Sequence, residues 1–112
     1  MSDKVIYKYR IPFDDDVSVD MPKDAQIVKF GIQGIDANNR PKVFAWALVN
    51  LPIETTEPRL FVIRGTGHPL HDFCVVSEND VPTNTPKFVY KDSLFDRAFV
   101  WHIFEGINVF NF

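Results

Sequence analysis

At 112 residues, the chain has the length of one ordinary domain, which can bury a core without disulfides or metal ions. Hydrophobic residues make up 46% and charged residues 24%, so an intrinsically disordered chain is excluded. The formal net charge is −3 and no long basic run occurs, so nucleic acid is not an expected partner. The single cysteine, Cys74, excludes an intrachain disulfide, and its apolar neighbours predict a buried thiol.

The first half of the chain contains alternating apolar and polar segments separated by turn residues. Residues 5–11 alternate and end at a proline, and residues 17–21 alternate again, so the two segments predict a hairpin-like pair of half-buried strands. Residues 26–32 predict a further strand, with Val28 and Phe30 on the same side.

The segments that follow along the chain are apolar on both faces, as central strands are. Residues 43–49, 60–63 and 73–76 show this pattern. Residues 88–90 and 98–104 then predict a last hairpin with a long tip between them. No window of 12 or more residues has uninterrupted amphipathic helical spacing.

These segments together predict an all-β fold in one domain over residues 1–112. We expect an antiparallel β-roll, barrel or sandwich of seven or eight short strands with little helix. The richness in Phe (11 residues) and the excess of Pro (8) over Gly (5) favour the same fold class. The residues expected to be largely buried are Trp46, Leu48, Phe61, Ile63, Val75, Phe99, Trp101 and Ile103.

The most unusual local sequence directly follows a predicted strand. It consists of Arg64, Gly65, Thr66, Gly67 and His68, followed by Pro69. Two glycines spaced by one residue can expose backbone N–H groups, so this loop is a candidate ligand-binding site for an anion or phosphate. It lacks the glycine spacing of a Walker or dinucleotide-binding motif. The other interpretation is a tight turn that needs positive φ at one glycine.

The histidines do not form a recognisable metal or catalytic motif. His68 and His71 lie three residues apart beside Asp72, a spacing that suits a helix face, whereas this segment is a loop. His102 shares a strand face with Phe104, which predicts a hydrogen-bonded core histidine. We therefore predict no metal site, no cofactor and no catalytic residue, although an enzyme remains a third alternative.

The segment 106–112 is an apolar C-terminal tail or terminal strand. It alternates apolar and polar residues and carries no charge. Such a strand either completes its own domain or pairs with another chain, in which case a homodimer is expected. The candidate interface residues are Ile107, Val109, Phe110 and Phe112.

Five segments, in the same order along the chain, carry a resemblance to a known family. They are residues 6–9 (IYKY), 21–27 (MPKDAQI), 46–49 (WALV), 61–69 (which contains GTGHP) and 100–105 (VWHIFE). On these residues the chain resembles a family of small phage and prophage proteins with a domain of unknown function. It departs from that pattern in extra polar residues at 34–41, a longer stretch at 71–87 and the added tail.

The resemblance implies an accessory phage protein in the cytoplasm of the infected bacterial host. The leading hypothesis is a binding protein that inhibits a host factor, such as a defence component, by stoichiometric binding. The alternative is a protein that sequesters a nucleotide signal through the loop at Arg64–His68, with an aromatic side chain stacked on the base. No run of 18 apolar residues occurs, so we expect no membrane-spanning segment.

Overall fold

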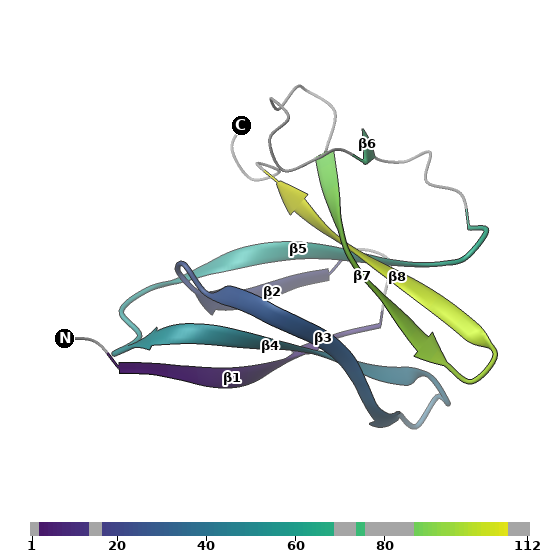
Figure 1. The fold of residues 1–112 in the computed structure, drawn as a ribbon, viewed down its shortest axis with the longest axis horizontal. Helices are drawn as coiled ribbons and strands as arrows, with labels where there is room; N and C mark the ends of the chain where they lie inside the picture. The colour runs from purple at the N-terminus through teal and green to yellow at the C-terminus, as the bar shows by residue number, and fades with distance from the viewer. Residues whose placement is uncertain (1–2, 14–16, 69–73, 76–86, 108–112) are drawn as a thin grey trace.

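The computed structural model describes residues 3–13, 17–68, 74–75 and 87–107, and these residues form eight β-strands and no helix (Figure 1). Seven strands pair antiparallel, and the two-residue β6 pairs parallel with β7, which confirms the all-β prediction. No helix within these described ranges is long and apolar enough to cross a membrane. The strands are β1 (Asp3–Ile11), β2 (Val17–Pro22), β3 (Gln26–Ile35), β4 (Pro41–Leu51), β5 (Thr56–Gly65), β6 (Cys74–Val75), β7 (Lys87–Asp96) and β8 (Phe99–Ile107).

The strands form two sheets, with the orders β1-β4-β3 and β2-β5-β8-β7-β6. The predicted hairpin of the first two strands is wrong, because β1 pairs with β4 and β2 pairs with β5 in the other sheet. Alternation shows that a strand has one buried face, but it does not show which strand lies beside it. The chain therefore changes sheets between Ile11 and Val17.

The core lies between the inward faces of the two sheets. Every second residue of β4 points inward and is buried: Val43, Ala45, Ala47 and Val49. The small alanines leave room for large side chains. Among these are Phe30 and Phe61, whose rings lie edge to face with centroids 5.9 Å apart.

A partly buried ion pair ties the five-stranded sheet to the turn that leads into β3. Arg59 Nε and Nη2 donate to the two carboxylate oxygens of Glu105, at 2.6 Å and 2.9 Å. Arg59 Nη1 also donates to the carbonyl oxygen of Ala25, at 2.7 Å. The bidentate geometry fixes the orientation of the guanidinium group. These bonds connect β5, β8 and the β2–β3 turn.

The predicted core is only partly correct. Phe61, Ile63 and Ile103 are buried as expected. Two of the expected core residues are exposed: Val75 at 44% and Phe99 at 56%. Val75 belongs to the two-residue β6, and Phe99 begins β8 directly after a turn, so neither is covered by a second sheet. The three others, Trp46, Leu48 and Trp101, are half-buried.

Two β-bulges explain further differences from the predictions. The last hairpin has a two-residue turn rather than a long tip, because β7 continues to Asp96 through a bulge between Tyr90 and Asp92. A second bulge, between Ile27 and Lys29, breaks the alternation of β3. Val28 is therefore 54% exposed and does not share the inward face of Phe30, in contrast to the prediction.

The core assignment predicts different effects for the same substitution at two positions. Ile103 is fully buried, so Ile103→Val should lower the free energy of unfolding by about 0.5–1.5 kcal/mol. The matched control is Ile6→Val, at a residue 57% exposed on the outward face of β1, which should change it by less than about 0.5 kcal/mol. Urea denaturation measures both. Equal losses at the two positions would contradict the sheet orientation.

The turn between β3 and β4 is held by one carboxylate. Asp36 Oδ1 accepts hydrogen bonds from the backbone N–H groups of Arg40 (3.0 Å) and Asn38 (2.8 Å). These bonds, with the positive charges of Arg40 and Arg10, lower the pKa of Asp36 below its usual 3.8.

A pH dependence follows from this lowered pKa. The folded state binds the Asp36 proton more weakly than the unfolded state does. The stabilisation that ionised Asp36 gives to the folded state is therefore fully present above the ordinary aspartate pKa. This stabilisation is lost as the pH falls through the lower pKa that Asp36 has in the folded protein. Asp36→Asn, which keeps an acceptor oxygen, should therefore lose less stability than the wild type on acidification from about pH 5 to pH 2. Thermal unfolding at each pH tests this, and parallel curves would refute it.

Candidate functional site

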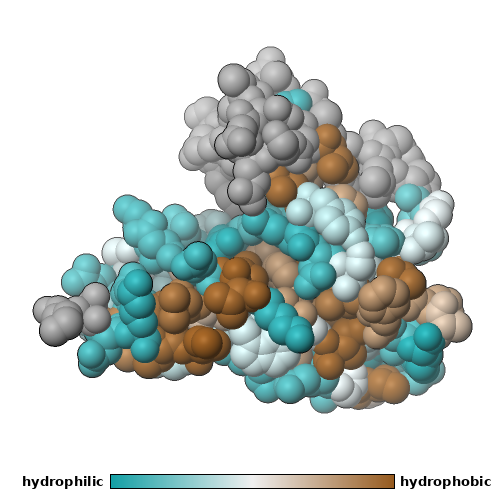
Figure 2. Space-filling view, in the orientation of Figure 1, coloured by the Kyte–Doolittle hydropathy of each residue, from teal (hydrophilic) through white to brown (hydrophobic). Residues whose placement is uncertain are grey.

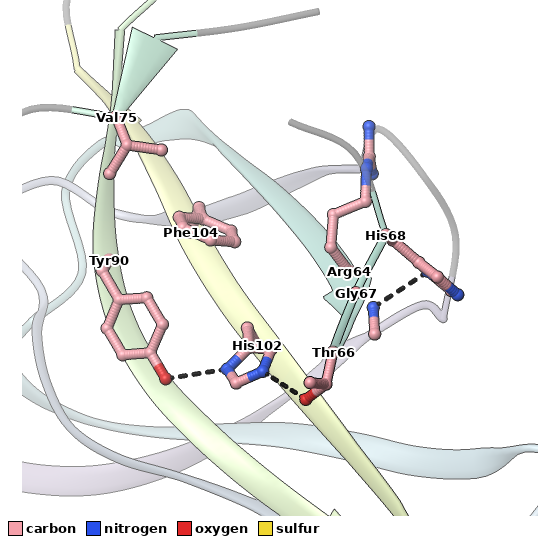
Figure 3. A pocket seen from close by; sticks show the side chains of 9 residues that line it. Arg64, Thr66, Gly67, His68, Val75, Tyr90, His102 and Phe104 are labelled. Atoms are coloured by element: carbon pink, nitrogen blue, oxygen red, sulfur yellow. Dashed lines mark hydrogen bonds between the residues drawn. The ribbon is translucent and has the colours of Figure 1, made fainter. Parts of the chain in front are cut away.

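A pocket of about 400 Å³ lies on the outward face of the five-stranded sheet (Figure 3). It is formed by the end of β5 and the turn after it, together with one residue each of β6 and β7 and two residues of β8. All five residues of the predicted ligand-binding loop line it. The lining residues are Arg64, Gly65, Thr66, Gly67, His68, Val75, Tyr90, His102 and Phe104.

The predicted loop is a tight turn whose N–H groups are largely used inside the protein. The N–H of His68 donates to the carbonyl oxygen of Gly65, at 3.1 Å, which closes the turn. The N–H of Gly65 donates to Nδ1 of His68, also at 3.1 Å, and that of Thr66 donates to the carbonyl oxygen of Val100. These three donors are not directed at the pocket, so a ligand there would meet mainly side chains.

The two glycines of this turn are required for different physical reasons. Gly67 has a φ of 88°, a conformation that L-residues with side chains rarely adopt. At Gly65 the constraint is space, because an added Cβ would lie 2.9 Å from Cε1 of His68 and 3.1 Å from Cζ3 of Trp101. The interpretation as a structural turn is therefore correct, and it does not conflict with a ligand beside the turn.

His102 is the polar centre of the pocket. Its Nε2 lies 2.8 Å from the hydroxyl of Thr66, and its Nδ1 lies 2.9 Å from the hydroxyl of Tyr90 and 3.1 Å from that of Ser93 (Figure 3). The hydroxyls of Tyr90 and Ser93 also contact each other. The prediction of a hydrogen-bonded histidine is confirmed. Its placement in the core is wrong, because the neighbouring Ile103 takes the inward position and His102 faces outward.

The hydroxyl partners are compatible with either neutral tautomer of the His102 imidazole. Each hydroxyl can donate or accept, so reorienting the hydroxyl hydrogens preserves the bonds in each state. Burial and the nearby charge of Asp92 raise the pKa of Tyr90, so its phenol keeps a proton to donate at neutral pH. The pocket can therefore offer a ligand both donors and acceptors.

The opposite wall of the pocket is apolar and aromatic. Phe104 is almost fully buried and packs with Val62 and Phe88 in a second hydrophobic cluster. The ring of Tyr90 lies edge to face with that of Phe104, with centroids 5.3 Å apart, and is tilted against the ring of His102. Flat side chains thus lie beside polar groups, as is typical of pockets for small organic ligands.

The sequence identified the loop but missed its partners across the sheet. Tyr90, Ser93 and Phe104 were not expected in a site, because they reach the loop only through the pairing of β5, β8 and β7. Of the predicted interface residues, Ile107 is half-buried and ends β8. The others, Val109, Phe110 and Phe112, lie outside the described residues. Among the described residues, no three His, Cys, Asp or Glu side chains are grouped so as to hold a metal ion.

The fold and the pocket define a small two-sheet β-domain with a cavity on the outer side of one sheet. The chain matches the domain of unknown function DUF7352 over residues 2–110 and belongs to that family. No curated protein and no solved structure matches it. The family description names no activity, so a function has to be argued from the surface of this chain.

The hydrogen bond between Thr66 and His102 gives a direct test of the network. Thr66→Val keeps the shape of the side chain but removes the hydroxyl, so Nε2 of His102 loses its partner. The ring nitrogen resonances of His102 should shift in a long-range ¹H–¹⁵N spectrum, with a stability loss of at most about 1 kcal/mol. The control Thr55→Val, at an exposed residue before β5, should leave them unchanged. Unshifted resonances in Thr66→Val would contradict the network.

Proposed function

We propose that this protein binds a small phosphate-bearing aromatic ligand, a nucleotide, in the pocket beside the Arg64–His68 turn. One observation carries the proposal: the five loop residues converge with His102, Tyr90 and Phe104 on one cavity. Its volume of about 400 Å³ falls within the range of about 300–1,000 Å³ that is usual for small-molecule sites.

Each part of such a ligand has a chemically suitable partner. The base stacks on the ring of Tyr90, which is 45% exposed, because every base has a flat π-face. Hydroxyl and ring nitrogen groups of the ligand exchange hydrogen bonds with Thr66 and His102. The guanidinium of Arg64, whose Nη1 also lies 3.4 Å from the carbonyl oxygen of Ile63, attracts the phosphate, for which its planar donor geometry is suited.

Binding without turnover is the better-supported mode of action. His102 and Thr66 have the geometry of a base beside a hydroxyl nucleophile. Acyl or phosphoryl transfer also requires donors aimed at the developing negative charge, whereas three N–H groups of the adjacent turn are already used within the protein. Stoichiometric sequestration of a nucleotide signal in the cytoplasm of a phage-infected bacterium is the biological setting that we propose.

A second candidate function is inhibition of a host protein by direct binding. It is favoured by the tip of the β7–β8 hairpin, where Phe95 is 77% and Phe99 is 56% exposed. Exposed aromatic side chains of this kind are frequent anchors of protein interfaces. Stoichiometric inhibition of a purified target that is lost in a Phe95→Ser, Phe99→Ser variant would favour it. The homodimer through the tail stays a separate prediction, which light scattering tests.

Calorimetry with a panel of linear and cyclic nucleotides tests the primary proposal. At least one nucleotide should bind with a Kd below about 100 μM, which corresponds to about −5.5 kcal/mol. Arg64→Gln should weaken its binding at least about tenfold but leave the binding of the corresponding nucleoside unchanged, because the substitution removes the contact to the phosphate and not the contacts to the base.

The matched control is Arg40→Gln, which removes an exposed guanidinium from the β3–β4 turn and should not alter nucleotide binding. The proposal is contradicted if no nucleotide of the panel binds with a Kd below about 100 μM. It is also contradicted by a ligand whose affinity is equally reduced by both substitutions.

A further inference from the structure

The outward face of the three-stranded sheet concentrates positive charge. The register of β1, β4 and β3 assigns alternate residues to this face, opposite to the buried inward residues. Since outward residues recur every second position, about 6.8 Å apart, the cations of β1 form a row along the strand. The basic residues on this face are Lys4, Lys8 and Arg10 of β1, Lys29 of β3 and Lys42 of β4.

No acidic residue balances these cations at the outward positions that the register of the described strands assigns. The other outward residues are neutral: Ile6, Gln26, Gly31, Gln33, Phe44, Trp46, Leu48 and Asn50. Of the acids near this face, Asp36 lies in the β3–β4 turn, where two backbone N–H groups hold its carboxylate. Asp92 of β7 lines a separate hollow with Lys29 at the edge of the face. The face is therefore cationic in a chain with a net charge of −3.

Two half-buried aromatic residues lie among these cations in the middle strand. The rings of Phe44 and Trp46 have centroids 6.1 Å apart. Lys8 Nζ lies 4.6 Å from the centroid of Phe44 and donates to Oε1 of Gln33, at 3.0 Å. The guanidinium of Arg10 lies 5.7 Å from the same centroid. Phe44 thus positions two cations, whereas no cation–π contact involves Trp46 among the described residues.

A shallow hollow of about 550 Å³ lies beside Trp46. Its walls include Ile6 and Val28, which are 57% and 54% exposed, and the polar side chains of Lys29 and Gln33. The absence of a side chain at Gly31 lets the indole lie close to the strand, since an added Cβ would be 3.0 Å from Cζ3 of Trp46. Figure 2 shows hydrophobic and hydrophilic residues side by side over β1, β3 and β4.

We propose that this face binds single-stranded nucleic acid, with the phosphates along the cations and a base in the hollow beside Trp46. A cationic surface with aromatic stacking positions is the usual design of sequence-tolerant single-strand sites. A duplex is disfavoured, because its bases are paired and stacked on one another and do not reach a shallow hollow on a sheet face. An acidic protein would match the charge but leaves the exposed apolar hollow unexplained.

Fluorescence anisotropy with a labelled twelve-residue oligothymidylate tests the charge contacts. The logarithm of the association constant should fall linearly with the logarithm of the salt concentration, by about 0.7 for each phosphate contact. The exposed lysines Lys8 and Lys29 can be changed without disturbing the core. The double variant Lys8→Gln, Lys29→Gln should reduce this slope by about 1.4. The matched control Lys23→Gln, Lys87→Gln, on a turn and on the other sheet, should leave it unchanged.

The same oligonucleotide tests the stacking position. Trp46→Leu keeps an apolar cover over the sheet but removes the indole, and should weaken binding about tenfold or more. Circular dichroism checks that this variant is folded, and the lysine variants decide the matter if it is not. The proposal is overturned if the oligonucleotide does not bind at low salt. It is also overturned if the two double-lysine variants show the same dependence of the association constant on salt concentration. Equal or tighter binding of a duplex, of polyglutamate or of phosphatidylglycerol vesicles also overturns it.

Discussion

The two-residue period of the strands is the constraint on which the rest of this structure depends. A β-strand presents successive side chains to opposite faces, and in a two-sheet domain only one face of each sheet can line the shared core. In β4 the inward positions are taken by small and β-branched residues, including Ala45 and Ala47. The larger Phe44 and Trp46 lie on the outward side of the same strand, so packing of the core does not explain why aromatic residues occur at these positions.

The same constraint creates the pocket on the other sheet. In β8, Ile103 occupies the core, and the flanking His102 and Phe104 are therefore directed to the outer side. Pairing with β5 and β7 then brings Thr66 and Tyr90 to His102. The two candidate binding surfaces thus lie on the outward sides of different sheets, each built on strands that also line the core.

The sequence predicted what depends on local pattern and missed what depends on pairing. Alternation in β1 and the turn chemistry at Gly67 were enough to predict a strand and a tight turn. The separation of β1 and β2 into different sheets could not be read from alternation, since it depends on which strands are neighbours. The bulge that exposes Val28 adds a residue to one strand, and the apolar pattern does not reveal it.

Net charge does not show how charges are distributed over a folded surface, which also depends on pairing. Cations that are far apart in the chain, such as Lys8 and Lys29, share one face only after β1 and β3 pair with β4. The predicted loop was located correctly, but its side-chain partners Tyr90 and His102 come from strands more than twenty residues away.

The account's central claim is that the outer face of the five-stranded sheet, and not the core or the hairpin tip, holds a small ligand. A ¹H–¹⁵N NMR titration of the full chain with adenosine monophosphate tests this most directly, because it reports every backbone amide at once. The account predicts saturable shifts centred on Thr66, Tyr90 and His102, with smaller shifts or none at the amides of β1. Saturable shifts that centre on β1 and β4, or spectra that do not change at millimolar nucleotide, would contradict it.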